Sequence, residues 1–431
     1  MSEGTAKKEE RRKFQAIKGT RDLLPPETAL WTRVERIAQE VFTSYGFGEI
    51  RLPIFEQTDL FARSIGLQTD VVSKEMYSFE DRDDTSVSLR PEVTASVCRA
   101  YIENGMQQWP QPVKLYTIGP MFRRERPQKG RYRQFYQIDA EVLGGGEAPG
   151  IDAELIEMVM TFFERLGLEG VELDINCIGD KKCRPKYVEL LRTELRKVKD
   201  KLGPDSQRRI ETNPLRVLDS KLENEQKLIE GMPHIADHLC EECAENYRGV
   251  KKELELRGVK YRENWRLVRG LDYYSRTTFE ITAEGLGSQN AVCGGGRYDG
   301  LIELLGGPPT RATGFAIGED RLILSLQESD KGLKTPSKGI FIVWMGEKAH
   351  AAALSTAAEL RRAGFRVELP PVEQKVGKAL GQADKLGTNC AVILGENEIA
   401  SGEYTVKTLS TGAQEKVPKA NLVGYLNSQF V

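Results

Sequence analysis

GPMFRRERPQKGRYRQFYQIDAE, residues 119–141, joins two apolar runs through a loop that is dense in positive charge. From Arg123 to Arg133, six of the eleven residues are Lys or Arg, although the chain of 431 residues has a formal net charge of −2. A net charge near zero argues against a protein that coats nucleic acid without specificity, but it allows a local basic site. The apolar runs, 113–122 and 134–144, predict two strands joined by this loop.

The second predicted strand has one apolar face and one mostly polar face. Its mostly polar face consists of Phe135, Gln137, Asp139 and Glu141. Successive side chains of a strand point to opposite faces of the sheet, so these four residues would lie together. A polar face on a strand that otherwise resembles core indicates that this face lines solvent or a site.

The ends of the two strands carry side chains suited to a nucleotide. Arg123 and Glu125 follow the first strand, and Phe135 begins the second. An arginine fork matches phosphate oxygens, an aromatic ring can stack on a base, and a carboxylate can accept from an exocyclic amine. The pair could therefore bind ATP, although the sequence has no GxxxxGK[ST] loop. The alternative is a charged hairpin tip that is only solvated, and the residues alone leave both possibilities open.

Other enzyme classes fit this sequence less well. The glycine-rich segments 144–150 and 293–300 lack the strand, GxGxxG turn and helix of a dinucleotide fold. The only histidines are His234, His238 and His350, and none is near a glycine cluster or a polar strand face. A hydrolase with a His-activated nucleophile is therefore not expected.

The segment HIADHLCEEC, residues 234–243, offers two His and two Cys as metal ligands. If the segment is one continuous helix, Cys240 and Cys243 lie roughly 180 to 240° around the axis from His234, at about 100° per residue. One tetrahedral ion could not then reach all four side chains. We therefore expect buried thiols, exposed imidazoles and no metal site, although a metal at Cys240 and Cys243 stays open.

The chain shows no sign of a membrane or secretory protein. No window approaches 18 consecutive apolar residues, and the charged N-terminus lacks the apolar stretch of a signal peptide. Seven cysteines at scattered spacings suggest no disulfide framework. We therefore expect a cytoplasmic protein.

Composition divides the chain into parts. Residues 1–13 predict a disordered charged tail, and 329–338 have the composition of a linker between domains. Charged helical runs over about 180–262 predict a helical insertion within the first domain, 14–328. In the last domain, 339–431, strands alternate with helices, which predicts a small α/β domain with a largely parallel sheet.

Several segments resemble the class II aminoacyl-tRNA synthetases. FRRE with RYRQFYQID resembles their motif 2, GFAIGEDRL their motif 3, and YGFGEIRLPIFE, with Pro53 inside it, their motif 1. LVRGLDYYSRTTFEI, residues 267–281, is similar to the more specific signature of histidyl-tRNA synthetases of the bacterial type. RPEVTA and CGGGRYDG stand where that family also has characteristic segments.

This resemblance extends from about residue 14 to the C-terminus. It implies an α/β protein with an α+β catalytic core, in which helices flank a class II-type antiparallel sheet. A helical insertion and a C-terminal α/β anticodon-binding domain would complete the fold. Within this scheme 14–328 is the catalytic domain and 339–431 the anticodon-binding domain.

The resemblance also implies an activity. L-Histidine would react with ATP, bound with Mg²⁺, to give histidyl-adenylate and pyrophosphate, and the histidyl group would then pass to tRNA(His), releasing AMP. The expected assembly is a homodimer. The main alternative is the non-catalytic synthetase-like regulatory subunit of histidine biosynthesis, and a second is a generic ATP-binding RNA protein. The intact RGLDYY segment and the extra C-terminal domain favour the synthetase.

Individual residues acquire roles through the resemblance. The residues implied for ATP are Arg123, Glu125, Arg131, Phe135 and Arg321. The residues implied for histidine are Glu92, Thr94, Arg123, Gln137, Glu141, Arg269, Tyr273 and Tyr274. Arg269 and Arg123 would be catalytic, since both would grip the α-phosphate. Gln137 and Glu141 also lie on the polar strand face inferred above, so two independent lines of reasoning meet there.

The tip of the basic loop would meet the tRNA. Arg126 and Gln128 are the candidates for reading the extra 5′ guanine of histidine tRNAs. Arg124 replaces a residue that is often histidine in bacterial relatives, and its role is left open.

Overall fold

The computed structural model describes residues 14–66, 69–146, 148–283, 291–328 and 339–429. These residues form two compact units. The first unit corresponds to the first predicted domain, and the second unit corresponds to the last. The predicted tail, 1–13, and the predicted linker, 329–338, lie outside the described residues.

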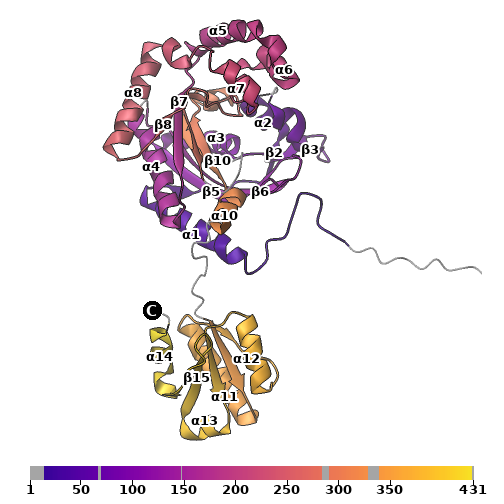
Figure 1. Cartoon of the computed structure of the whole chain (residues 1–431), viewed down its shortest axis with the longest axis vertical. Coiled ribbons are helices and arrows are strands. Elements are labelled where there is room, and N and C mark those ends of the chain that lie inside the picture. Colours follow the sequence, from indigo (N-terminus) through magenta and orange to yellow (C-terminus); the bar gives the residue numbers. More distant parts are fainter. Residues whose placement is uncertain (1–13, 67–68, 147, 284–290, 329–338, 430–431) are drawn as a thin grey trace, which may run out of the picture. The chain divides into compact units, whose positions relative to one another are not determined.

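An eight-stranded sheet forms the centre of the first unit (Figure 1). In sheet order, its strands are β1 (Gly48–Glu49), β5 (Val113–Phe122), β6 (Gln134–Leu143), β11 (Ala312–Gly318), β10 (Ala291–Arg297), β9 (Ser275–Thr282), β7 (Glu172–Cys177) and β8 (Arg262–Glu263). Each of the six central strands runs antiparallel to its central neighbours, and only the short end strands β1 and β8 pair in parallel. The predicted antiparallel core is confirmed.

The strands on either side of the basic loop are the two that the sequence predicted. β5 and β6 pair over their full length, with Gly119 opposite Gln137. On the apolar face of β6, Ile138 and Ala140 are fully buried. On its polar face, Glu141 is 2% exposed, so this face points into the molecule and not to bulk solvent.

Helices cover the apolar face of the sheet. Their apolar residues recur at helical spacing, so each helix has an apolar side that packs against this face. α1 (Thr28–Ser44) and α4 (Pro149–Leu166) pack there, and Phe42 of α1 contacts the rings of Phe162 and Phe315. The other helices of the core are α2 (Thr58–Ile65), α3 (Thr94–Glu103), α9 (Leu301–Leu304) and α10 (Glu319–Glu328).

The stretch resembling motif 1 contains two short strands. Pro53 lies between β1 and β2 (Phe55–Gln57), and β2 joins a small three-stranded sheet. Its partners there are β4 (Ser86–Leu89) and β3 (Tyr77–Glu80). Proline has no N–H to donate to a strand ladder, and Pro53 lies outside both strands.

The helical insertion leaves the sheet after β7 and returns to it before β9. It contains α5 (Arg184–Lys197), α6 (Pro204–Thr212), α7 (Glu223–Ile229) and α8 (Glu241–Leu256). In Figure 1, α5, α6 and α7 lie together, whereas α8 lies apart from them beside α4. The helices α5, α6 and α7 share a core of buried residues, such as Leu191, Ile210 and Ile229.

The segment 234–243 is not one helix, so that assumption was wrong. A single 3₁₀ turn, Ile235–His238, ends at Leu239, whose backbone is extended. Cys240 is also extended, and it is the N-cap of α8. The His and Cys side chains are therefore not arranged around a common helix axis, and the geometric argument against a metal no longer holds.

The second unit is a five-stranded sheet with helices. Its strands, in sheet order, are β13 (Arg366–Glu368), β12 (Gly339–Trp344), β14 (Cys390–Leu394), β15 (Glu403–Thr408) and β16 (Gln414–Pro418). Its helices are α11 (Glu347–Arg362), α12 (Val376–Lys385), α13 (Glu396–Ser401) and α14 (Leu422–Ser428). Only β13, β12 and β14 pair in parallel.

The prediction of a largely parallel sheet therefore fails for half of the second unit. β15 runs antiparallel to β14, and β16 then turns back against β15 as a hairpin. Among the described helices of both units, none combines the length and the apolar character that crossing a membrane requires.

Candidate active site

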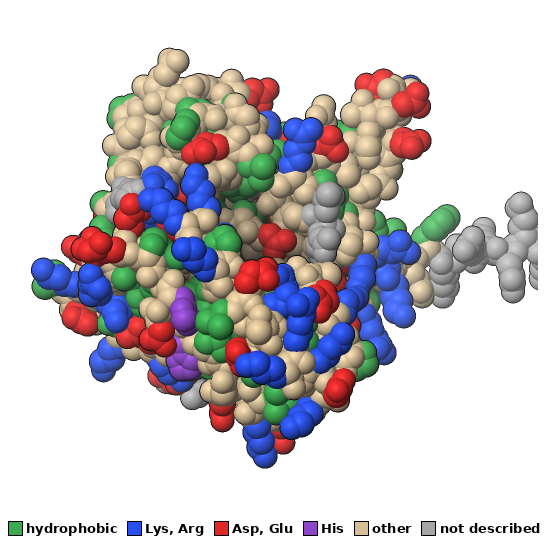
Figure 2. Space-filling model, turned by 90° about the horizontal axis from the view of Figure 1, so that it is seen from above, with side chains coloured by type: hydrophobic (Ala, Val, Ile, Leu, Met, Phe, Trp, Pro, Cys, Tyr) green, Lys and Arg blue, Asp and Glu red, His purple; other side chains and the backbone are tan. Residues whose placement is uncertain are grey.

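A single cavity of about 520 Å³ lies over the polar face of the central sheet. It is lined by every residue that the sequence predicted for ATP or histidine. These residues are Glu92, Thr94, Arg123, Glu125, Arg131, Phe135, Gln137, Glu141, Arg269, Tyr273, Tyr274 and Arg321. Figure 2 shows a hollow in the molecule with acidic side chains in it and Lys and Arg side chains around it.

Glu141 on β6 is held in one position at the deep end of the cavity. Its Oε1 accepts a hydrogen bond from the Thr94 hydroxyl at 2.7 Å, and its Oε2 accepts one from the Tyr298 hydroxyl at 2.6 Å. Gly314 on β11 makes the room, since a Cβ there would stand 1.5 Å from Glu141 Oε2. Burial raises the pKa of Glu141 to about 8.

Glu92, Asp139 and Gln137 also lie at this end of the cavity. Glu92 accepts from the backbone N–H groups of Thr94 at 2.9 Å and Ala95 at 3.1 Å, at the start of α3. Burial raises the pKa of Glu92, and burial together with the charge of nearby Glu141 raises the pKa of Asp139 well above its usual value.

Two buried acceptors of the cavity are left over. Gln137 Oε1 and Asp139 Oδ2 have no hydrogen-bond partner within the described part of the chain. Buried polar atoms normally have partners, so these two oxygens fit a bound donor or cation.

The opposite side of the cavity is cationic. The Arg123 Nε donates to the carbonyl of Pro91 at 2.9 Å, and its guanidinium lies 5.3 Å from the centre of the Phe135 ring. Arg131 Nη1 lies 3.3 Å from Glu125 Oε2. The backbone contact fixes Arg123, whereas the Arg131 pair is partly exposed and can separate at little cost.

Two arginines from distant segments complete the cationic side. Arg269 Nη1 lies 2.7 Å from Glu280 Oε2 on β9. The guanidinium crosses β10 at Gly294, where a Cβ would lie 2.0 Å from Nη2, so this glycine makes room for the arginine. Arg321 donates to the carbonyl of Ala291 at 3.1 Å. Burial lowers the pKa of Arg321, and nearby Arg131 lowers it further, which reflects cations gathered in one place.

The two residues predicted for tRNA do not line this cavity. Arg126 and Gln128 are exposed on the loop between β5 and β6. Backbone hydrogen bonds between Gln128 and Arg131, of 3.1 and 2.9 Å, close a tight turn at this tip. Arg124 is also exposed, and its N–H donates to the carbonyl of Glu75 at 2.7 Å.

Sequence reasoning assigned no role to Asp139, Tyr298 or Glu280, which also line the cavity. A signal was present for two of them. Asp139 lies on the polar face of β6, and Tyr298 follows the glycine run of β10. The contact of Tyr298 with Glu141, however, joins residues far apart in the sequence. Only the pairing of β6, β11 and β10 brings them together.

An antiparallel sheet with this order, carrying converging arginines on one face, is the catalytic architecture of the class II aminoacyl-tRNA synthetases. Two family models match the chain. One, described as histidyl-tRNA synthetase, matches residues 19–179 and 190–322, and an anticodon-binding domain matches 339–429.

Individual relatives cover nearly the whole chain. A histidine–tRNA ligase of Solibacter usitatus is 50% identical over 416 residues, which cover 96% of this chain and 99% of that protein. One of Koribacter versatilis is 51% identical over 425 residues, 96% of each. The crystal structure of apo S. aureus histidyl-tRNA synthetase has a TM-score of 0.79 and 38% identity, covering 96% of this chain and 100% of that one. The chain belongs to the histidyl-tRNA synthetase family.

Proposed function

We propose that this protein ligates L-histidine to tRNA(His) in two steps. The histidine carboxylate attacks the α-phosphate of ATP, which gives histidyl-adenylate and pyrophosphate. A terminal ribose hydroxyl of the tRNA then takes the histidyl group, and AMP leaves. The observation that carries this proposal is one cavity with a cationic side and a buried acidic end.

The acidic end suits histidine. The ammonium group would bind Glu92, the Thr94 hydroxyl and the unpartnered Gln137 Oε1. A buried ammonium needs acceptors and negative charge. This end supplies the acceptors, and the bound ammonium would itself favour the ionised form of Glu92, whose pKa burial raises.

The imidazole would bind between Glu141 and Tyr274, with Tyr273 beside them. The rings of Tyr273 and Tyr274 are 4.8 Å apart, and Tyr273 donates toward Glu92 at 3.4 Å. Two polar groups fixed at the right separation can select an imidazole, since an analogue without both ring nitrogens would leave one of them unpaired.

The cationic side suits a bent ATP. Arg123 and Arg269 would hold the α-phosphate, and Arg131 and Arg321 the γ-phosphate. Phe135 would stack on the adenine, and Glu125 would accept from its amine once the exposed Arg131 pair separates.

Catalysis in this arrangement is electrostatic. Negative charge develops on the α-phosphate oxygens as the histidine carboxylate attacks, and fixed guanidinium groups stabilise that charge without any protein nucleophile. Mg²⁺ enters with ATP as part of the substrate and offsets phosphate charge. Arg269 would also bind the histidine carboxylate, and so align it with the phosphorus.

The tRNA would be recognised at two places. Arg126 and Gln128 lie on an exposed tip beside the cavity, where they can read the acceptor end. The second unit, 339–429, matches an anticodon-binding domain and would bind the anticodon. We further propose that the protein is a homodimer and works in the cytoplasm.

Histidine-dependent exchange of pyrophosphate into ATP tests this function. The purified chain should catalyse the exchange with L-histidine alone and should charge tRNA(His) when tRNA is added. The regulatory subunit would catalyse neither reaction. A generic ATP-binding RNA protein would show no dependence on histidine. Absence of exchange in a folded, histidine-binding protein would therefore refute the proposal.

A further inference from the structure

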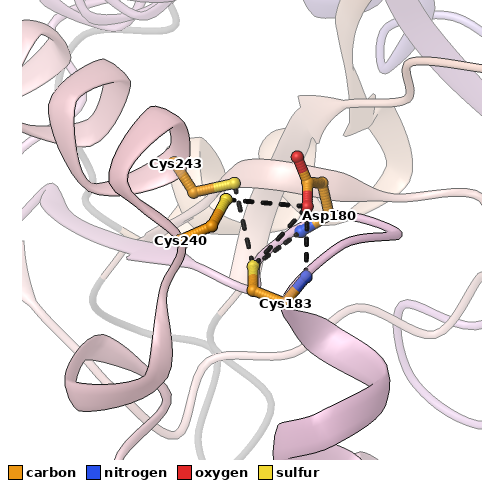
Figure 3. Close-up of side chains that lie close together, drawn as sticks. All are labelled: Asp180, Cys183, Cys240 and Cys243. Atoms are coloured by element: carbon orange, nitrogen blue, oxygen red, sulfur yellow. Dashed lines mark hydrogen bonds between the residues drawn. The ribbon is translucent and has the colours of Figure 1, made fainter.

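Four potential metal ligands lie together outside the active-site cavity. They are Asp180, Cys183, Cys240 and Cys243, and their ligand atoms are all within 4.8 Å of one another. Figure 3 shows the three sulfurs and the carboxylate pointing toward a common centre. Cys243 is fully buried, and the Asp180 side chain is 13% exposed. Cys183 is also buried, whereas Cys240 is partly exposed, so the cluster is only partly accessible to solvent.

Two short motifs of the same form supply these ligands. Asp180 and Cys183 are separated by two residues in the loop that starts α5, and Cys240 and Cys243 are separated by two residues at the start of α8. Pairs with this spacing are typical of structural zinc sites. Because Asp180 stands where the first Cys of such a pair would be, the sequence does not show two Cys-x-x-Cys pairs.

Three of the six distances between the ligand atoms are close to those of a tetrahedral site, and all six are within 4.8 Å. Zn–S bonds of about 2.3 Å put two sulfurs about 3.8 Å apart, and a Zn–O bond of about 2.0 Å puts the oxygen about 3.5 Å from each sulfur. Cys183 Sγ and Cys243 Sγ are 3.9 Å apart. Asp180 Oδ1 is 3.6 Å from Cys183 Sγ and 3.9 Å from Cys240 Sγ.

Burial raises the pKa of the Cys183 thiol to about 11 and also raises the pKa of the Cys240 thiol, so a cation bound in the cluster would have to displace the thiol protons. Cys183 is the N-cap of α5 and Cys240 the N-cap of α8, so two helix N-termini face the cluster with their partial positive charge. The backbone N–H of Asp180 donates to Cys183 Sγ at 3.4 Å. All seven cysteines are free, and the 3.9 Å between Cys183 and Cys243 greatly exceeds a disulfide bond of about 2.05 Å.

A second layer of contacts orients the carboxylate. Arg276, only 2% exposed, lies 3.6 Å from Asp180 Oδ2, the oxygen that faces away from the sulfurs. The backbone N–H of Lys182 donates to Oδ1 at 2.9 Å. Three thiolates and one carboxylate exceed the charge of a divalent ion, and Arg276 offsets part of the excess. Metal ligands commonly have such outer partners.

We propose that Asp180, Cys183, Cys240 and Cys243 bind one structural Zn²⁺ ion. Four protein ligands fill a tetrahedral shell, so the site has no open position and is not catalytic. The ion would join the start of the helical insertion to the start of its last helix. Since Cys183 and Cys243 lie on different helices, the metal acts as a cross-link between segments with no other covalent connection nearby.

The site also touches the wall of the histidine pocket. Arg184, next to Cys183, donates to the carbonyl of Tyr274 at 2.6 Å. Backbone hydrogen bonds of 2.8 Å join Ile178 and Gly179 to Arg276, two residues beyond Tyr274. Metal loss should therefore loosen the insertion and raise the KM for histidine, with a smaller effect on the KM for ATP.

Metal analysis of the purified full chain tests the proposal without reference to activity. Protein from cells grown with added zinc should contain about one zinc ion per chain. Refolding with Co²⁺ should give the sulfur-to-metal charge-transfer and visible bands of a tetrahedral thiolate site. Cys183→Ser and Cys243→Ser should lose the metal, whereas Asp180→Cys should keep it with a stronger charge-transfer band.

Two controls separate metal loss from misfolding. Cys390→Ala removes a buried free cysteine of the second unit and should keep the zinc. If the serine variants do not fold, chelator treatment of the unmodified chain should lower its Tm, and Zn²⁺ but not Mg²⁺ should restore it. A reduced protein that takes up neither Zn²⁺ nor Co²⁺, serine variants that retain zinc, or a Cys183–Cys243 disulfide in the native protein would each overturn the proposal.

Discussion

A single side chain, Glu141, can determine which ligand the cavity selects. It is buried, accepts hydrogen bonds from Thr94 and Tyr298, and occupies the space left by Gly314. With both oxygens already accepting, the carboxylate is fixed in orientation before any ligand arrives. A bound imidazole therefore meets a preorganised acceptor, which reduces the entropy cost of binding.

The titration of Glu141 should be visible in the pH dependence of the stability of the ligand-free protein. Burial raises the pKa of Glu141 from 4.5 to about 8, so its contribution to stability is present below pH 4.5 and is lost as the pH rises through 8. Glu141→Gln is neutral at every pH. Its Tm relative to the unmodified protein should therefore rise between about pH 5 and about pH 9, by about 1–2 °C for each kcal/mol of relative stability gained.

Thermal melts across this pH range check the prediction about Glu141. Glu103→Gln, which changes a carboxylate with a 66% exposed side chain, is the matched control and should show no comparable trend. A Tm difference for Glu141→Gln that does not vary with pH would contradict the assignment.

Arg269→Ala should cost about 10²–10³ in the rate of histidine-dependent pyrophosphate exchange, because it removes a fixed donor to the charge that develops on the α-phosphate. Arg269→Lys keeps the charge but loses the planar fork, so its exchange rate should lie between the rates of the unmodified protein and of Arg269→Ala. Arg36→Ala, on the exposed face of α1, is the control. Ordinary exchange by a folded Arg269→Ala protein would refute the catalytic role.

At the level of residues, the sequence predicted the lining of the cavity well, because the motifs carry their functional residues at fixed local spacing. It did not predict contacts that join separate motifs. Asp180 shows the same limit, since its two-residue spacing from Cys183 means little until folding brings α8 beside it. Pairs far apart in the sequence leave no local trace.

Among the elements, β6 was the most predictable. Its alternation identified both the core face and the polar face, and every residue of that polar face lines the cavity. The segment 234–243 was the least predictable, because a continuous helix was assumed across Leu239. Glu241 and Glu242 were an available signal, since acids favour the first turn of a helix and mark its start after Cys240.

The basic loop between β5 and β6 should act on tRNA and not on adenylation. Arg126→Ala should raise the KM for tRNA by about tenfold and reduce the salt dependence of tRNA binding by about one unit of slope. Pyrophosphate exchange should not change, because the side chain lies outside the cavity. Steady-state charging at several salt concentrations measures both effects.

Arg36→Ala again serves as a control of equal charge for the loop variant. If it changed the KM for tRNA as much as Arg126→Ala does, the effect would be one of net charge. A parallel loss of pyrophosphate exchange in Arg126→Ala would instead place the loop tip in the adenylation site.

The whole molecule consists of two units with separate hydrophobic cores. The core of the second unit draws its buried residues only from positions 340–426. Its alternating strands and helices predicted a small α/β fold correctly, but not the direction of β15. Only residues 395–402 connect β14 to β15, which is too short for the crossover that a parallel pair requires, so β15 runs antiparallel to β14.

Separate cores predict separable activities. A chain ending at residue 328 should keep histidine-dependent pyrophosphate exchange, since all residues that line the cavity precede that position. It should charge tRNA(His) far less efficiently, because the unit that matches an anticodon-binding domain is missing. Comparing the two assays on the truncated and full chains tests this, and equal loss of both would show that the catalytic unit depends on the second unit.

The central claim is that arginines from three distant segments meet on one triphosphate beside a pocket for imidazole. A crystal structure of the full chain with ATP and histidinol, which lacks the reacting carboxylate, tests it most directly. The guanidinium groups of Arg123, Arg269 and Arg321 should lie within about 3 Å of phosphate oxygens, with the imidazole between Glu141 and Tyr274. Phosphates bound away from these arginines, or an imidazole outside that pocket, would contradict the claim.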